Sequence, residues 1–347
     1  MVGGLVNIYV PADVPMREGD VKPFLDLLSR MLPVESDRAI LLAYMAAVVQ
    51  HPGAKFSWAP VLQGCPGNGK SRLISTLTYA VGGRYVYEPN AQEIGERFNS
   101  WLENKVLIVA EEIHMGERRQ TQEKLKALIT NRRIAIEGKG VDQRMIDNLA
   151  NWAFCTNHKN GIIKTRDERR YAIFFTAQQE AAHLARDGMT GDYFVSLVGW
   201  LERGAGYAHV AHYLKHYAIP AALNPAGACN RAPETSSTVA AIEEARGPLE
   251  QAILEAIAEE RVGFRGGWVS SWAIADLMQS NGQRKPGTNT LRSAMESLGY
   301  AKHDLRPSPI LQEGGARPTL YVRAGAHPDY ALAQGYVTGR MPSLVGR

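Results

Sequence analysis

Cysteine is scarce in this 347-residue chain, with only Cys65, Cys155 and Cys229. Three cysteines cannot build a disulfide framework, and their spacings fit no zinc site. We therefore expect reduced, structural thiols. The chain also has no run of eighteen or more apolar residues, so we expect no membrane-spanning helix and no membrane partner. Its start lacks the basic residues and apolar centre of a signal peptide, and no internal repeat is visible.

The net charge is small, at +4, but it is unevenly distributed. Residues 115–170 contain 13 Lys and Arg against 7 Asp and Glu, and residues 265–323 contain 8 against 4. Two basic regions on a chain that is otherwise near neutral favour a polyanionic partner. Solvated surface charge is the alternative, and charge alone does not separate the two interpretations.

Alternating helical and strand patterns predict an α/β fold with a mainly parallel sheet. Short apolar runs predict buried strands at 59–63, 106–110, 152–155 and 171–176. Helical patterns occupy 21–50 (interrupted at Pro33), 71–81, 117–130 and much of 176–217. Residues 133–137 and 142–146 flank Gly138-Lys139-Gly140 and predict a hairpin.

The same patterns divide the chain into five segments. They are an N-terminal helical segment (1–54), a core with its following helices (55–222), a linker (223–245), a second domain (246–325) and a tail (326–347). The linker is predicted because Pro, Ala, Ser and Asn replace any periodic pattern there. The second domain shows helix, strand, helix, helix and hairpin, which is the order of a winged helix-turn-helix.

A glycine-rich motif follows the first predicted strand. Residues 64–71, Gly-Cys-Pro-Gly-Asn-Gly-Lys-Ser, match the P-loop pattern G-x-x-x-x-G-K-[ST]. Glycines let successive amide hydrogens point at phosphate oxygens, and the following helix start adds its dipole. The predicted phosphate-binding residues are Gly64, Pro66, Gly67, Asn68, Gly69, Lys70 and Ser71. Lys70 would reach the β- and γ-phosphates of ATP, and Ser71 would offer its hydroxyl to Mg²⁺.

Polar residues end two further strands. Glu111 and Glu112 follow the run 106–110, at the strand end where ligands bind in parallel sheets. One glutamate would help to coordinate Mg²⁺, for which Glu111 is the candidate, and the other would polarise the attacking water. Asn157 ends the third strand and can bond the γ-phosphate or the water. The alternative for Asn157 is a simple turn former.

An arginine-rich segment precedes the last strand of the core. Residues 166–170 read Arg-Asp-Glu-Arg-Arg. An arginine supplied to a neighbouring subunit's nucleotide would stabilise charge that develops on the γ-phosphate. Arg169 is the first choice for this role and Arg170 the second. On its own, such a cluster is also compatible with a solvated turn.

The motifs GCPGNGKS, VLIVAEE, IAIEGKG, FCTN and RDERRYAIF occur in this order within residues 20–178. The set resembles the superfamily 3 helicases, and within them the helicase part of phage and large-DNA-virus primase-helicases. The resemblance implies an AAA+-like P-loop ATPase that assembles as a hexameric ring, with an arginine acting in trans. It also implies movement along single-stranded or forked DNA in phage- or virus-type replication.

In that family a hairpin carries a lysine that grips the DNA backbone, and Lys139 occupies the matching position. Some relatives place a histidine next, where this chain has Gly140. A lysine between glycines contacts phosphate without reading bases, although an exposed turn is the alternative. In the second domain, Arg292 is the candidate DNA contact on the third helix.

These observations predict an ATP-dependent DNA helicase motor. The alternative is an ATP-gated DNA-binding replication initiator or regulator with little unwinding activity. A third class, an AAA+ remodeller that does not bind DNA, is disfavoured by the two basic regions. We expect a cytoplasmic protein, in the host cytoplasm if the chain is phage-encoded. The P-loop lies too near the start of this sequence for a preceding primase domain, so we expect that a primase or polymerase is a separate partner, or that the chain is a fragment or a standalone helicase.

Overall fold

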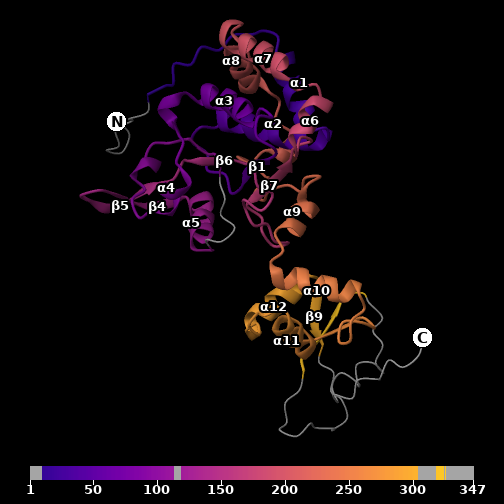
Figure 1. Ribbon diagram of the computed structural model, residues 1–347. Helices are drawn as coiled ribbons and strands as arrows, with labels where there is room; N and C mark the ends of the chain where they lie inside the picture. The colour runs from indigo at the N-terminus through magenta and orange to yellow at the C-terminus, as the bar shows by residue number, and fades with distance from the viewer. Residues whose placement is uncertain (1–9, 113–118, 304–317, 324, 326–347) are drawn as a thin grey trace. The chain divides into compact units, whose positions relative to one another are not determined.

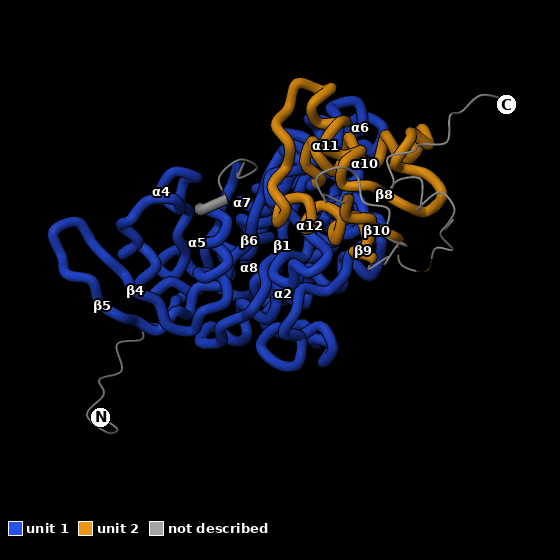
Figure 2. The backbone as a smooth tube through the Cα atoms, turned by 90° about the horizontal axis from the view of Figure 1, so that it is seen from below, with its two compact units in different colours: residues 1–245 blue, residues 246–347 orange. Residues whose placement is uncertain are grey.

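The computed structural model describes residues 10–112, 119–303, 318–323 and 325. Two compact units divide the chain at residues 245 and 246, and Figure 2 shows them in different colours. Among the described residues, none of the helices is long and apolar enough to cross a membrane. The predicted α/β fold with a mainly parallel sheet is confirmed in the first unit.

The first unit holds sixteen helices and strands in its described part, together with three short 3-10 turns (Figure 1). They are α1 (Lys22–Met31), α2 (Glu35–Gln50), β1 (Ala59–Gln63), α3 (Lys70–Val81), β2 (Val86–Tyr87), α4 (Ala91–Gly95), β3 (Leu107–Ala110), α5 (Arg119–Thr130), β4 (Arg133–Gly138), β5 (Val141–Asp147), β6 (Asn151–Thr156), β7 (Tyr171–Phe175), α6 (Ala181–Arg186), α7 (Gly191–Arg203), α8 (Gly206–His216) and α9 (Thr238–Glu244). The short turns are η1 (Gly83–Tyr85), η2 (Ser100–Leu102) and η3 (Ala221–Leu223).

Five strands form the central sheet, in the order β2-β3-β6-β1-β7. Every neighbouring pair in it is parallel. Gln63, at the end of β1, pairs with Thr156 on one side and Phe175 on the other. Three adjacent strands therefore end at the same level, and the segments that follow them meet at one edge of the sheet.

Apolar side chains cover both faces of this sheet because successive residues of a strand point to opposite sides. Leu62, Cys155 and Phe174 pack on one side with α1, α2, α3, α7 and α8. Val61 and Phe154 pack on the other side with α4, α5 and β4. The result is a three-layer arrangement, which Figure 1 shows with helices on either side of the strands.

Strands β4 and β5 form an antiparallel hairpin that extends from the body of the unit beside α4 and α5 (Figure 1). Asn99, which is 7% exposed, binds β4 along its length. The side-chain N–H of Asn99 donates to the carbonyl of Ala135 at 3.0 Å, and its side-chain oxygen accepts from the N–H of Glu137 at 2.9 Å. Strand β4 is thus held up to the residues just before the tip, whereas Lys139 at the tip is exposed.

The segment predicted as a linker, 223–245, is bound along the first unit instead of standing apart from it. Trp58 donates its indole N–H to the carbonyl of Cys229 at 2.9 Å. Asp37, which is 2% exposed, accepts from both the backbone and the hydroxyl of Ser236. Helix α9 also lies within the segment. These contacts are long-range, so composition alone could not reveal them.

The second unit consists of α10 (Pro248–Ala258), β8 (Trp268–Ser270), α11 (Ser271–Ser280), α12 (Thr288–Ser297), β9 (Tyr300–His303) and β10 (Leu320–Arg323). Its three strands form an antiparallel sheet in the order β8-β10-β9. Ile253, Ile274 and Met295, one from each helix, are fully buried in a separate core. The order of elements is helix, strand, helix, helix and two strands, as the sequence pattern predicts.

The Asp37 carboxylate gives the first testable prediction. Replacing it (Asp37→Ala) removes the charged acceptor of two hydrogen bonds from Ser236 and should lower the free energy of unfolding by about 2 kcal/mol. Chemical denaturation measures this loss, and limited proteolysis should then cleave the 223–245 segment faster. The exposed Glu35 lies in the same helical turn, so Glu35→Ala is the matched control and should cost less than about 1 kcal/mol. Equal effects of the two substitutions would show that the Asp37–Ser236 hydrogen bonds do not hold the 223–245 segment in place.

Candidate functional site

The glycine-rich loop connects the end of β1 to the start of α3. It leaves the sheet between the ends of β6 and β7, since Gln63 pairs with both strands. The N–H of Gly64 donates to the carbonyl of Thr156 at 3.3 Å, and the N–H of Cys65 donates to the carbonyl of Gln178 at 2.9 Å. Neighbouring strands therefore hold both sides of the loop at its origin.

Two loop positions require glycine. At Gly64 a Cβ atom would lie 2.0 Å from the hydroxyl oxygen of Thr176, so no side chain fits. Gly69, the residue that precedes α3, has a φ of 92°, which side chains with a Cβ rarely adopt. A tight turn that opens directly into a helix is the geometry that directs backbone N–H groups toward an anion.

Lys70 lies folded into the loop and is only 7% exposed. Its ammonium donates to the carbonyls of Gly64 at 2.8 Å and Cys65 at 2.9 Å, and to the side-chain oxygen of Asn68 at 3.0 Å. Burial lowers the pKa of Lys70 below its ordinary value, and the nearby Glu111 carboxylate partly opposes this shift. The ammonium is thus held at the centre of the loop by oxygen acceptors of the loop itself.

Asn68 fastens the loop to the end of β7. It is fully buried, and its amide donates to the hydroxyl of Thr176 at 2.9 Å. That hydroxyl in turn donates to the carbonyl of Gln178 at 3.1 Å. The polar groups of the loop therefore pair with one another and with β7, which fixes the shape of the loop.

A cavity of about 390 Å³ lies over the loop. Its lining comes from four places in the fold: the loop with the start of α3, and residues that follow β3, end β6 or lie on α7. The residues are Pro66, Gly67, Asn68, Gly69, Lys70, Ser71, Arg72, Glu111, Glu112, Cys155, Thr156, Asn157, Phe194 and Val198. Burial raises the pKa of the Cys155 thiol to about 12, so this cysteine stays protonated beside the cavity.

The structure brings the sequence-predicted acidic and amide residues to this cavity. Glu111 and Glu112 follow β3, and both are exposed toward solvent. Glu112 has a φ of 54°, an unusual backbone conformation for a residue other than glycine. Asn157 follows β6, and its carbonyl accepts from the amide of Gln63 at 3.3 Å. Glu111, Glu112 and Asn157 thus line the same cavity as the glycine-rich loop.

Five lining residues were not predicted as site residues from the sequence: Arg72, Cys155, Thr156, Phe194 and Val198. Phe194 and Val198 lie one turn apart on α7, and Arg72 lies in the first turn of α3. A methyl group at Gly69 would come within 3.1 Å of the Phe194 ring, so this ring lies close to the loop. The helical pattern marked Phe194 only as an apolar residue, because its contact with the loop is formed over more than a hundred residues of sequence.

Other predicted site residues lie away from the cavity. Arg169 and Arg170 precede β7 and therefore lie at the opposite edge of the sheet, where Tyr171 pairs with Ala59. Lys139 lies at the tip of the β4–β5 hairpin. Arg292 belongs to α12 of the second unit, and its guanidinium bonds the Glu296 carboxylate at 2.9 Å.

Comparisons with known proteins give a family match and a shared fold. Residues 62–170 match the family described as "Family of unknown function (DUF5906)". The structure resembles three chains of the NrS-1 C-terminal region, two of them given as residues 305–718, with TM-scores of 0.62, 0.61 and 0.58. Sequence identity is 15%, 14% and 15%; the matches cover 91%, 91% and 90% of this chain and 79%, 79% and 78% of the others. The likeness shows a common fold. No curated protein matches the sequence.

The close approach at Gly64 gives a prediction for the loop. Gly64→Ala forces the new Cβ into Thr176 and should destabilise the chain by about 1–3 kcal/mol, because the surrounding backbone cannot shift freely. Thermal unfolding measures the effect. Gly53 has no atom within 4 Å of an added Cβ, so Gly53→Ala is the control and should stay within about 0.5 kcal/mol of wild type. An unchanged melting temperature for Gly64→Ala would show that the loop is loosely packed.

Proposed function

We propose that the chain is the ATP-hydrolysing motor of a ring-shaped DNA helicase in phage- or virus-type replication, built on an AAA+-like P-loop core. One observation carries the proposal. The glycine loop with Lys70, the carboxylates of Glu111 and Glu112, and Asn157 all line one cavity at the carboxyl edge of a parallel sheet. This is the set of groups that phosphoryl transfer uses, since it needs positioning and charge stabilisation more than covalent chemistry.

The loop supplies the binding of the triphosphate. Phosphates would lie at the start of α3, where backbone N–H groups and the helix dipole favour negative charge. An incoming phosphate would replace the loop oxygens that now accept from Lys70. Because the pKa of Lys70 is lowered by burial, a phosphate that restores a full negative partner would also favour its charged form.

The donor set fits Mg²⁺. Ser71 offers a hydroxyl and Glu111 a carboxylate in the same cavity, and Mg²⁺ is usually held by one or two such groups together with phosphates and waters. Bound there, the ion would neutralise charge on the β- and γ-phosphate oxygens. Glu112 and Asn157 remain to orient and polarise the attacking water, and both are exposed enough to reach it.

Helix α7 supplies the wall for the nucleoside. Phe194 and Val198 are half-buried and line the cavity beside the loop, whereas most other lining groups are polar. An aromatic ring beside the phosphate loop offers a stacking surface for a purine base. The chain therefore provides both ends of an ATP site.

DNA contacts are proposed for the hairpin and for the second unit. Lys139 is exposed next to Gly140, whose φ of 75° makes the tight tip of the hairpin. A single ammonium there would bind the backbone phosphate without base preference, as translocation requires. We propose that the second unit is a winged helix, and its α12 exposes Asn289, Arg292 and Ser293. The Arg292–Glu296 pair is exposed and therefore weak, so Arg292 can exchange its partner for a phosphate.

The proposed assembly is a hexameric ring of copies of this chain. The arginine-rich segment lies at the edge of the sheet opposite the cavity, so a neighbouring copy would have to supply the arginine. A separate primase or polymerase would work with the ring, in the cytoplasm of the host cell if the chain is phage-encoded.

A replication initiator with little unwinding activity is the second candidate. The separate core and exposed α12 of the second unit favour it, because a DNA-recognition module is the part that such a protein needs. The two candidates differ in what DNA does to the rate of ATP hydrolysis. A motor couples turnover to translocation, whereas a clamp hydrolyses slowly whether or not DNA is present.

ATP hydrolysis with and without single-stranded DNA tests the motor, with sizing of the assembly alongside. We expect DNA to stimulate the wild type, and we expect Lys70→Ala to lose turnover by at least about a hundredfold. Lys139→Ala should keep its basal rate and lose the stimulation, because it removes only a phosphate contact outside the cavity.

Lys215→Ala is the matched control for Lys139→Ala, because Lys215 is exposed on α8 and belongs to no proposed contact. It should retain full stimulation. A chain that stays monomeric, with the same ATPase rate at every DNA concentration, would contradict the helicase proposal and favour the initiator.

Nucleotide affinity tests the role of α7. Phe194→Ala removes the stacking surface and should weaken binding of ATP by about tenfold. Its neighbour Val195 is 68% exposed and does not line the cavity, so Val195→Ala should bind as wild type does. Calorimetric titration measures both. If Phe194→Ala binds ATP normally, the base lies elsewhere.

A further inference from the structure

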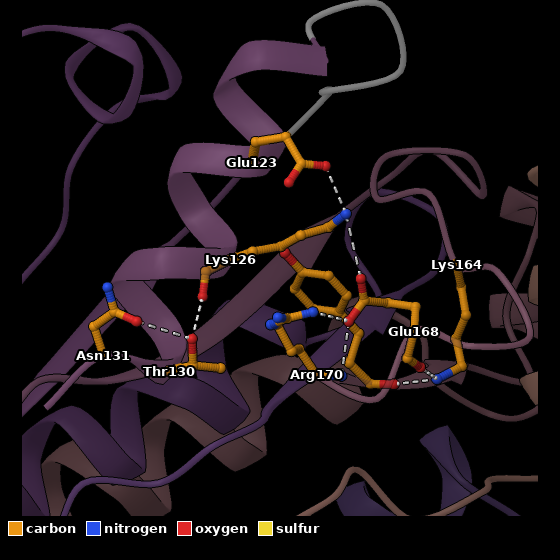
Figure 3. A network of polar contacts seen from close by, with 8 residues as sticks. Glu123, Lys126, Thr130, Asn131, Lys164, Glu168 and Arg170 are labelled. Carbon is orange, nitrogen blue, oxygen red and sulfur yellow. Dashed lines mark hydrogen bonds and ion pairs between the residues drawn. The ribbon is translucent and has the colours of Figure 1, made fainter.

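A buried carboxylate organises the arginine-rich segment before β7, as Figure 3 shows. The side chain of Glu168 is 6% exposed. One of its oxygens accepts from the backbone N–H of Arg170 at 3.0 Å and from its guanidinium at 3.1 Å. The other lies 3.5 Å from the ammonium of Lys126 on α5. Glu168 is therefore held between two cations and shapes the backbone that follows it.

A second buried side chain, that of Lys164, holds the same segment by hydrogen bonds to its backbone. The ammonium of Lys164, a residue that is 6% exposed, donates to the carbonyls of Glu168 at 2.9 Å and Tyr171 at 2.7 Å. Burial lowers the pKa of Lys164, and the Glu168 carboxylate opposes the shift. In addition, the N–H of Glu168 donates to the carbonyl of Thr165 at 3.1 Å, which makes a turn. Side-chain and backbone bonds thus fix the segment on both sides of residue 169.

The two adjacent arginines differ sharply in their surroundings. Arg170 is 25% exposed, is paired with Glu168, and has its Nε atom buried. Arg169 has an exposed side chain that bonds to no other residue in the described part of the chain. Its backbone is nevertheless held, because its carbonyl accepts from the N–H of Ala232 at 2.8 Å. Of these two residues, Arg169 has the available guanidinium, and Arg170 helps to hold the segment that presents it.

Arg169 cannot serve the cavity of its own chain. Tyr171 pairs with Ala59 at the start of the sheet, and Phe175 pairs with Gln63 where the glycine loop begins. Those two levels are separated by roughly 13 Å along β7, and Arg169 lies beyond the farther one. Arg169 therefore lies at the edge of the sheet opposite the cavity, and a cavity of this kind within its reach would belong to a second copy of the chain.

We propose that Glu168, braced by Lys126 and Lys164, is a positioning residue that presents Arg169 to the nucleotide of a neighbouring copy. The inference rests on the proposed ring-shaped ATPase and adds to it which arginine acts and what orients it. Neutralising Glu168 would remove its ion pairs with Lys126 and Arg170 and weaken its hydrogen bonds to Arg170, so the backbone that carries Arg169 would be held less firmly. The defect would therefore appear in the site of the neighbour.

Mixing of subunits tests this prediction. Arg169→Ala should lower ATP turnover by at least about a hundredfold, and Glu168→Gln by about tenfold or more, whereas both should still bind ATP normally. Lys70→Ala copies cannot hydrolyse ATP but carry an intact Arg169. Added in equal amount, they should restore turnover to either variant, because roughly a quarter of the sites in a random ring would then combine a working loop with a working arginine.

Glu123→Gln is the control. Glu123 contacts the same Lys126 ammonium at 2.8 Å but is 62% exposed, and Arg170 is bonded by Glu168 instead. This variant should turn over ATP as wild type does. Lys126→Met provides a second test if Glu168→Gln folds poorly in thermal unfolding. It removes one of the two cations beside Glu168 and should give a weaker defect that Lys70→Ala copies also restore.

The outcomes separate the inference from the proposed function. If Lys70→Ala copies restore Arg169→Ala but neither Glu168→Gln nor Lys126→Met, then Glu168 only stabilises its own chain and the positioning role is overturned. Normal turnover of Arg169→Ala would overturn the choice of arginine. Absence of turnover in the wild type would instead contradict the proposed ATPase itself.

Discussion

The parallel alignment of β6, β1 and β7 is the constraint on which the rest of the candidate site depends. Gln63 pairs with Thr156 and Phe175, so these strands end together and their following segments must share one edge. Tyr171 pairs with Ala59, so β1 and β7 also begin together. The glycine loop and the arginine-rich segment therefore lie at opposite edges of one rigid sheet. No local rearrangement of either loop can bring them together within a chain.

Hydrogen bonds are the main reason that the glycine-rich loop keeps its shape. Glycine costs about 0.5–1 kcal/mol in conformational entropy relative to alanine. A buried polar group without a partner costs about 1–3 kcal/mol, so the second effect dominates. In the loop, Lys70 and Asn68 satisfy carbonyl and hydroxyl groups that would otherwise be buried without partners. Under the proposed function, a phosphate would replace these acceptors without refolding of the loop, which is how a preformed anion site should behave.

Sequence patterns located the elements that have a local signal and missed those defined by distant contacts. The apolar run 59–63 predicted β1 with its observed bounds, and Pro33 marked the break between α1 and α2. Strand β2 has two residues and α4 has five, too few for any periodicity. Likewise, nothing in a helical pattern distinguishes an apolar residue that lines a cavity, such as Phe194, from one that fills a core. The positions of Glu111 and Asn157 after apolar runs nevertheless predicted that both lie at the carboxyl edge of the sheet, where the structure has them.

The arginine pair shows what burial adds to residue type. Arg169 and Arg170 are chemically identical neighbours, and spacing cannot rank them on physical grounds. The buried Glu168 carboxylate distinguishes them, because it needs a cationic partner. Leaving it unpaired in the interior would cost far more free energy than an exposed ion pair contributes. Arg170 is consequently fixed to Glu168, and Arg169 is left facing outward. A single chain then has the glycine-rich loop at one edge of the sheet and the exposed guanidinium of Arg169 at the other. Nucleotide turnover that needs both groups must depend on contact between copies, which couples the chemistry to assembly.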